Sequence, residues 1–195
     1  MTDFNPVVTG GRQDILLCKR CGESVGVCES LRRSETPLQR PPKRSTPSYK
    51  NLTYAPFYYG IRDKKKLEKI VEETLKLTGL YEEVAGELHK SALKLSGGQK
   101  QRLCIARALT VEPKVLLLDE PCSALDVKAS AKIEELLKNL KERYTIVIVT
   151  HNLAQTKRIA DDVAFFQNGR LVETKDAETF WEKPECEETK EFLKG

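Results

Sequence analysis

The strongest constraint on the fold is a run of four aliphatic residues that ends in two acids. Val115–Leu118 are all aliphatic, and Asp119, Glu120 and Pro121 follow at once. A short apolar run of this kind is typical of a strand that is buried on both faces, as in a parallel sheet. Because ligands of parallel-sheet proteins bind outside the carboxyl ends of the strands, Asp119 and Glu120 are expected at a binding crevice. The pattern predicts an α/β fold.

The rest of the chain after residue 50 alternates between helical and strand patterns. A second aliphatic run predicts another buried strand over 145–149. Asn168-Gly169, between two apolar segments at 163–166 and 170–173, predicts a hairpin with a two-residue turn. Apolar residues at helical spacing predict helices over 64–78, before Gly79, over about 97–110, and over about 127–143. Alternating strands and helices predict a parallel sheet with crossover helices.

A glycine pair marks the start of the second of these helices. Ser96 precedes Gly97 and Gly98, and Gln99 follows them. Serine is a preferred residue at the N-cap of a helix, and glycines leave the first backbone N–H groups open to close approach. The positive end of the helix dipole also lies there, so a phosphate would be stabilised at this position. The two segments together predict carboxylates for a metal ion and amides for an anion.

Four short motifs occur in an order and spacing that resemble those of ABC-transporter ATPases. These motifs are Leu95–Gln99, Leu118–Pro121, Ser123–Asp126 and Thr150–His151. The wider sequence after Asn51 is similar to the ATPase subunit of bacterial phosphate importers. The resemblance implies a P-loop NTPase-like ABC nucleotide-binding domain that is truncated, with part of the helical subdomain over 51–95. Residues 96–195 would hold the signature helix and the second half of the catalytic core.

The resemblance implies three roles at the strand ends. Asp119 would hold Mg²⁺ through water, Glu120 would polarise the water that attacks the γ-phosphate, and His151 would be the switch residue that reaches that phosphate. A hydrolytic water needs an acceptor within hydrogen-bonding distance, and the charge of the transferring phosphoryl group needs a nearby cation. The alternative is structural: two carboxylates that cap a loop before Pro121, and a histidine that only follows a strand.

The resemblance also implies a set of residues that contact ATP across a dimer. In ABC ATPases two nucleotide domains hold ATP between them head to tail, and the signature segment, here Leu95–Gln99, contacts the ATP of the opposite subunit. The loop that contains Ser123 and Asp126 would lie against the opposite site. The nucleotide-contacting candidates are therefore Ser96, Gly97, Gly98, Gln99, Ser123 and Asp126.

The function implied is that of the ATP-hydrolysing subunit of a phosphate importer, with ATP and Mg²⁺ as cofactors. Such a subunit works as a dimer beneath two membrane-spanning permease subunits, on the cytoplasmic face of the membrane, with a separate phosphate-binding protein acting indirectly. An alternative is a non-catalytic remnant that pairs with an intact subunit through Ser96–Gln99. A chromosome-maintenance ATPase would need a long coiled coil, and the sequence has no sustained heptads.

Composition and charge argue against two other classes of protein, those that span a membrane and those that bind nucleic acids. No segment has 18 consecutive apolar residues, so the sequence predicts a cytosolic protein that reaches a membrane only through partners. The net charge of +4 comes from residues 1–50, which hold nine Lys and Arg against five Asp and Glu, while residues 51–195 hold 24 of each. That basic segment offers only Phe4 and Tyr49 as aromatic residues, so nucleic-acid binding is not expected.

The first fifty residues differ from the rest. They contain five of the nine prolines and show no sustained period, which predicts loop or disorder. No Gly-Lys-Ser or Gly-Lys-Thr of a P-loop occurs in the sequence. Ordinary codons for Arg32–Arg40, read two bases later, encode Gln-Lys-Arg-Asn-Pro-Phe-Ala-Lys, which resembles the glutamine loop of phosphate-importer ATPases. Residues 1–50 are therefore expected to be unrelated, disordered or translated out of frame.

Overall fold

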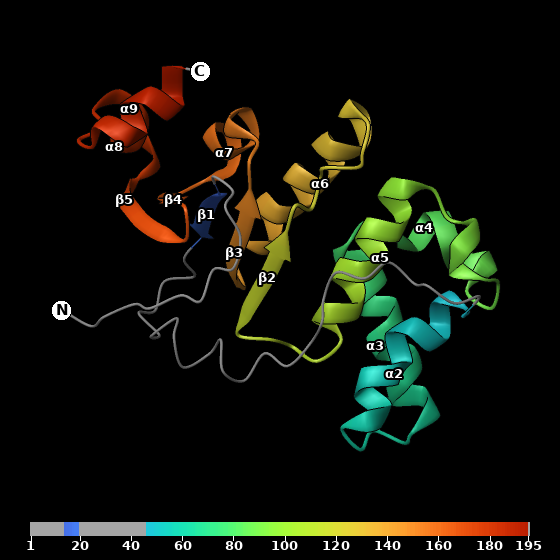
Figure 1. Cartoon of the computed structure of the whole chain (residues 1–195). Helices are drawn as coiled ribbons and strands as arrows, with labels where there is room; N and C mark the ends of the chain where they lie inside the picture. The colour runs from blue at the N-terminus through green and yellow to red at the C-terminus, as the bar shows by residue number, and fades with distance from the viewer. Residues whose placement is uncertain (1–13, 20–45, 195) are drawn as a thin grey trace. The chain divides into compact units, whose positions relative to one another are not determined.

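The computed structural model describes residues 14–19 and 46–194, which form two compact units (Figure 1). The sheet unit contains residues 14–19, 115–121 and 141–194, and the helical unit contains residues 46–114 and 122–140. The elements in chain order are β1 (Asp14–Lys19), α2 (Ser48–Tyr58), α3 (Lys64–Leu77), α4 (Tyr81–Val84), η1 (Ala85–Glu87), η2 (Ala92–Lys94), α5 (Gly97–Leu109), β2 (Val115–Asp119), α6 (Val127–Leu140), β3 (Thr145–Thr150), α7 (Leu153–Ile159), β4 (Asp162–Gln167), β5 (Arg170–Asp176), α8 (Ala177–Glu182) and α9 (Glu187–Lys194).

The strands of the described residues form one sheet of five, in the order β2-β3-β1-β4-β5. The expected parallel pairing is confirmed for β2 and β3, in which Leu117 lies opposite Val147. The other pairings among the described strands are antiparallel. Leu116 of β2 and Ile148 of β3 are fully buried, as aliphatic strands covered on both faces should be. The α/β fold that the sequence predicts is therefore present, with a mixed sheet.

The predicted hairpin joins β4 to β5. Asn168 and Gly169 both have positive φ angles, 52° and 75°, as a two-residue turn between antiparallel strands requires. Phe165 of β4 lies opposite Glu173 of β5 and is fully buried. The turn sets the pairing of Phe166 with Leu171, and a register shift between Phe165 and Phe166 places Phe165 opposite Glu173.

The structure corrects the expectation of loop or disorder over residues 1–50 at two places. Asp14–Lys19 forms β1, which pairs with β3 on one side and β4 on the other, and α2 begins at Ser48. The apolar run at 15–18 is as long as the run that predicts β2, but it lies among residues without a sustained pattern, and backbone pairing to two neighbouring strands gives it its strand structure. Residues 1–13 and 20–45 lie outside the described part of the chain.

The helical unit packs α2, α3 and α5 around one apolar core. Gly79, at φ 59°, ends α3 as predicted. Its N–H donates to the Lys76 carbonyl oxygen, and the N–H of Leu80 donates to that of Leu75, which is the Schellman arrangement. The buried residues of this core are Leu52, Val71, Leu75, Leu80, Val84, Ala92, Leu103 and Ala106.

α5 and α6 have nearly the predicted limits, whereas α4, α7, α8 and α9 were not predicted from the sequence. α5 covers Gly97–Leu109 as expected, while α6 ends at Leu140, three residues before the predicted end. The sequence places a boundary at residue 95, but the helical unit continues to Lys114, because Leu103 and Ala106 of α5 pack in the core of that unit. Within the described ranges no helix has the length and apolarity to cross a membrane.

Candidate functional site

The parallel pairing of β2 and β3 brings two predicted site segments to one edge of the sheet. Asp119 lies opposite Val149, and the Glu120 N–H donates to the Val149 carbonyl oxygen at 2.8 Å, which extends the ladder beyond the end of β2. His151 directly follows Thr150, the last residue of β3. Because parallel strands end at the same edge, Glu120 and His151 become neighbours although they are 31 positions apart.

Glu120 and His151 form the closest contact at this edge. Glu120 Oε1 accepts a hydrogen bond from the His151 backbone N–H at 3.1 Å, and His151 Nδ1 contacts the same oxygen. A ring nitrogen that faces a carboxylate carries the proton, so Nε2 of His151 is left to face other groups. The side chain of His151 is 69% exposed and that of Glu120 is 27% exposed. The pair can therefore meet a ligand while holding its own geometry.

The backbone at Glu120 is unusual. Its φ angle is 49°, in the left-handed region that non-glycine residues seldom adopt. Such a conformation costs roughly 1–3 kcal/mol and persists where surrounding contacts impose it, which is common at functional sites. The ladder bond to Val149 and the two contacts with His151 supply that restraint.

A hydrogen-bonded turn fixes the backbone on either side of His151. The Thr150 hydroxyl donates to Gln155 Oε1 at 3.1 Å and accepts from the Asn152 N–H at 3.1 Å. The Asn152 side chain caps α7 by accepting from the Gln155 N–H at 2.9 Å. Asn152 and Gln155 are not among the residues predicted from the sequence, although asparagine followed three residues later by glutamine is an N-cap pattern that could have identified them.

In the helical unit, the signature segment begins α5 with the predicted cap. Ser96 Oγ accepts from the Gln99 N–H at 3.3 Å, and Gln99 Oε1 accepts from the Ser96 N–H at 2.9 Å. The amides of Gly97 and Gly98 lie in the first turn, where no carbonyl of the helix can accept from them. This end of α5 can therefore offer N–H groups to an anion, as the sequence predicts.

The two glycines also permit close packing against the loop that contains Ser123 and Asp126. An added Cβ at Gly98 would lie 3.0 Å from the Cβ of Ala129 in α6, and one at Gly97 would lie 3.3 Å from the Leu125 side chain. The structure thus brings two of the predicted motifs together within the helical unit. Asp126 has a structural task as well, because its carboxylate accepts from the Ala129 N–H at 2.9 Å at the start of α6, while Ser123 is exposed.

Glu83 and Arg102 form an ion pair beside the signature segment, and neither residue was predicted from the sequence. Both nitrogen–oxygen distances from Arg102 Nη2 to the Glu83 carboxylate are 2.9 Å, and Gln99 Nε2 donates to the same carboxylate at 2.9 Å. Burial acts to raise the pKa of Glu83, but the hydrogen bonds from Gln99 and Arg102 outweigh it and hold that pKa below its ordinary value. No local sequence pattern links Glu83 to residues 16 and 19 positions later.

The donor set at the strand ends fits Mg²⁺ with a nucleotide. Asp119 is exposed and presents carboxylate oxygens, the ligands that Mg²⁺ prefers. Over residues 14–19 and 46–194, no group of three or more His, Cys, Asp or Glu side chains is arranged to hold a metal ion alone. Mg²⁺ commonly takes one or two carboxylates and completes its shell with water and phosphate oxygens. Asp119 is therefore suited to a metal ion that arrives with ATP.

Comparison with known proteins identifies close relatives of this sequence. The sequence model of the ABC transporter family matches residues 20–123, which is just over half of the chain. The chain is 52% identical over 147 residues to the phosphate import ATP-binding protein PstB of Borreliella burgdorferi, an alignment that covers 75% of this chain and 56% of that protein. The chain thus spans a little over half the length of that relative.

Proposed function

The chain belongs to the ABC transporter family, and on that basis we propose that it is an ATP-binding subunit of a phosphate importer that couples ATP hydrolysis to uptake of inorganic phosphate. The choice of phosphate rests on the 52% identity to a phosphate import ATP-binding protein. The observation that carries the ATPase assignment is the Glu120–His151 contact beside Asp119, at the carboxyl ends of β2 and β3. Two carboxylates and an imidazole lie at this edge of the sheet, and hydrolysis of a phosphoanhydride needs an acceptor for the attacking water and a ligand for the metal ion.

Each of the three groups has a distinct task in this proposal. Glu120 accepts a hydrogen bond from the attacking water and so raises its nucleophilicity. His151, held by Glu120 through Nδ1, directs Nε2 toward the terminal phosphate and fixes the orientation of the carboxylate. Asp119 holds the Mg²⁺, which when bound neutralises charge on the phosphate oxygens. Strain in the Glu120 backbone is consistent with a site that is organised before ATP arrives.

The signature segment would contact the ATP that a second subunit binds. The exposed Ser96 hydroxyl and the first-turn amides at Gly97 and Gly98 provide donors for a terminal phosphate. The phosphate-binding loop of that site would belong to the second subunit, as the resemblance to ABC ATPases implies. The proposed working form is therefore a dimer in which each partner completes the site of the other.

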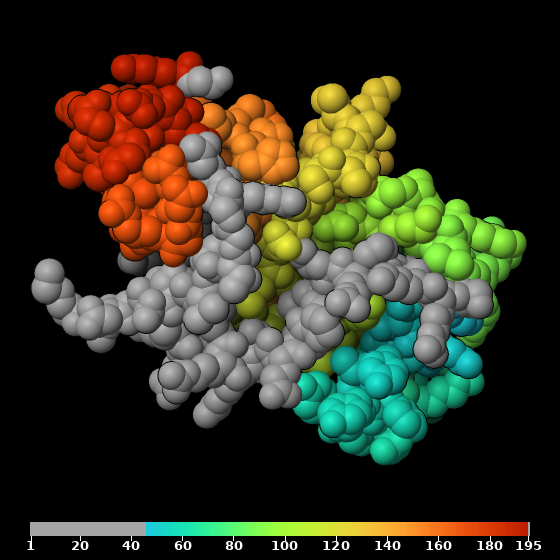
Figure 2. Space-filling model, in the orientation of Figure 1, coloured from blue at the N-terminus to red at the C-terminus, as the bar shows by residue number. Residues whose placement is uncertain are grey.

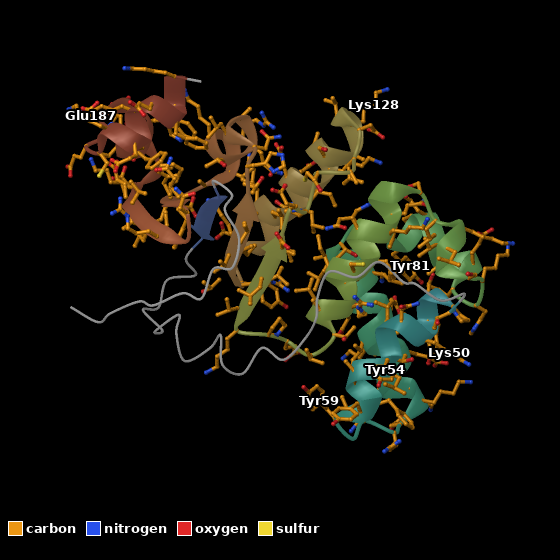
Figure 3. The ribbon with its side chains drawn as sticks, viewed as in Figure 1. Lys50, Tyr54, Tyr59, Tyr81, Lys128 and Glu187 are labelled. Atoms are coloured by element: carbon orange, nitrogen blue, oxygen red, sulfur yellow. The ribbon has the colours of Figure 1, made fainter. Side chains whose placement is uncertain are left out.

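The permease partner would contact exposed aromatic residues of the helical unit. Tyr54, Tyr58 and Tyr59 are 74%, 75% and 68% exposed, and Figure 3 shows Tyr54 and Tyr59 projecting from α2 and its end. Figure 2 shows α2 and the residues after it, in cyan and teal, at the surface. Tyrosine is enriched in protein interfaces, where its ring is buried and its hydroxyl stays hydrogen-bonded. This surface is a suitable contact with permease subunits at the cytoplasmic face of the membrane.

The proposal is tested by phosphate uptake in cells that carry substituted copies of the gene. Ser96→Arg should slow the uptake of radioactive phosphate several-fold, because a large cation would occupy the space of the nucleotide. Ala131→Arg, which adds the same charge at an exposed position of α6, should leave uptake unchanged. Uptake of sulfate should not respond to either change. If Ser96→Arg slows sulfate uptake instead of phosphate uptake, or slows neither, the proposed function is wrong.

A second candidate is a non-catalytic subunit that pairs with an intact one. The observation in its favour is the lack of Gly-Lys-Ser or Gly-Lys-Thr in the 195 residues. In that case a change at Ser96 still affects uptake, because Ser96 contacts the partner's nucleotide. A change at Glu120 does not affect uptake. Glu120→Gln therefore distinguishes the two candidates: loss of uptake favours the catalytic subunit, and unchanged uptake favours the non-catalytic one.

A further inference from the structure

Both ends of the Gln99 side-chain amide form hydrogen bonds to other residues of this chain. Oε1 accepts from the Ser96 N–H at 2.9 Å, and Nε2 donates to Glu83 Oε2 at 2.9 Å. A glutamine amide can be rotated by 180° at almost no steric cost, so its orientation is decided by the groups around it. The Glu83 carboxylate accepts hydrogen bonds but cannot donate them. It therefore attracts the NH₂ end of Gln99 and leaves the oxygen to face Ser96.

Glu83 is itself held in place by two cationic side chains. Arg102 Nη2 contacts both of its oxygens at 2.9 Å, and Lys132 of α6 lies 3.8 Å from one of them. The Arg102 side chain is only 8% exposed, and its Nη1 donates to the Gly79 carbonyl oxygen at 2.7 Å. A buried guanidinium with these fixed partners allows the carboxylate little freedom. The short helix α4, which begins at Tyr81 (Figure 3), thus presents a rigid acceptor to the start of α5.

We propose that Glu83 is a positioning residue for the signature segment and that it acts through Gln99. By fixing the amide of Gln99, it keeps the Ser96 N–H bonded within the chain. The amides of Gly97 and Gly98 then stay in one orientation, in which they are available to a phosphate. The functional consequence rests on the proposed contact between this segment and the ATP of a second subunit. The local arrangement does not depend on that contact.

Amide hydrogen exchange of the full chain, followed by NMR, tests the local arrangement. Glu83→Gln keeps the shape of the side chain but allows it to donate as well as accept, so it removes the control over Gln99. We expect exchange of the Ser96 N–H to accelerate about tenfold relative to that of Leu103, in the middle of α5. Glu82→Gln, a change at the exposed neighbouring acid, should alter neither rate. Equal acceleration at Ser96 and Leu103 would indicate loss of stability alone and would overturn the proposal.

A double-substitution cycle tests whether Glu83 acts through Gln99. Gln99→Leu removes both side-chain hydrogen bonds and leaves the Glu83–Arg102 pair intact. It should accelerate exchange at Ser96 as much as Glu83→Gln does, and the two changes together should add nothing further. If the two effects multiply in the double variant, Glu83 reaches Ser96 by another route and the proposed pathway is wrong.

ATP turnover in a mixed dimer with a complete subunit tests the functional consequence. Glu83→Gln should lower kcat several-fold and leave KM for ATP within about twofold, because the partner's loop binds the nucleotide and this chain acts in the closed site. Glu82→Gln should change neither kcat nor KM. If the unsubstituted chain does not stimulate the partner, the proposed function fails, while the exchange data still decide the role of Glu83. If the chain stimulates the partner and Glu83→Gln has no effect on kcat, the positioning role is refuted.

Discussion

The buried carboxylate of Glu173 in β5 should make the sheet unit sensitive to acid. Its oxygens accept from the backbone N–H groups of Glu185 at 2.9 Å and Cys186 at 3.1 Å, and Lys175 Nζ lies 3.3 Å away. Burial alone would raise its pKa, but the nearby Thr189 hydroxyl, the hydrogen bonds from these two amides and the Lys175 ammonium lower it to about 2 from the ordinary 4.5. The carboxylate thus holds the chain after α8 and the start of α9 against β5.

The size of the effect follows from that shift. A difference of 2.5 between the two pKa values of Glu173 corresponds to about 3 kcal/mol of stability, on the scale of about 1.4 kcal/mol per unit. The folded-state pKa is the lower one, so the contribution is complete above pH 4.5 and is lost as the pH falls toward 2. At pH 3 less than half of it should remain. Glu173→Gln removes the ionised group and with it this dependence.

Urea unfolding followed by fluorescence provides the measurement. Trp181 in α8 is the only tryptophan of the chain and lies in the same unit, so its emission reports on this region. At pH 7 Glu173→Gln should lower the free energy of unfolding by up to about 3 kcal/mol, and the gap should shrink between pH 4.5 and pH 2. Glu191→Gln, at an exposed position of α9, should change it little. A gap that is absent at pH 7, or equal at pH 7 and pH 2, would refute the reasoning.

Three further substitutions test packing and backbone geometry. Gly98→Ala should cost about 1–3 kcal/mol of stability, measured by circular dichroism in urea, because the new Cβ would lie 3.0 Å from that of Ala129; an equal or smaller cost than that of Gly97→Ala would contradict the packing argument. Leu75→Ala should cost about 2–5 kcal/mol by the same measurement, since the side chain is fully buried in the helical unit. Gly169→Ala should cost about 1 kcal/mol through its φ of 75°, and a stability gain would mean that the turn is not of the two-residue type.

Local patterns predicted four of the described strands, β2 to β5, and three of the described helices, α3, α5 and α6. The aliphatic runs gave β2 and β3, the Asn168-Gly169 pair gave the β4–β5 turn, and Gly79 marked the end of α3, because each depends on residues close together in the sequence. The strand β1 was not predictable in the same way. It is paired with β3 and β4, which are more than 125 positions later, and no local pattern encodes that pairing.

The candidate site was predictable as a list of residues but not as a set of contacts. The motif resemblance named Glu120 and His151 separately, and the parallel register of β2 and β3 explains why they meet. Glu83 could not be found from the sequence, because its role depends on how α4 packs against α5. Long-range ion pairs of this kind follow from the fold and leave no spacing rule in the chain.

The role of the chain within an ATPase dimer is tested most directly by phosphate release from mixed dimers with a complete subunit that has its own phosphate-binding loop. Ser96→Arg in this chain should lower the turnover of the partner about tenfold or more, because the signature segment meets the partner's ATP. Glu120→Gln in this chain should leave hydrolysis of the partner-bound ATP almost unchanged, because the partner's own acids act on that nucleotide, whereas Glu120 acts on a nucleotide that this chain itself binds. Loss of turnover with Glu120→Gln, together with normal turnover for Ser96→Arg, would contradict this assignment of the two sites.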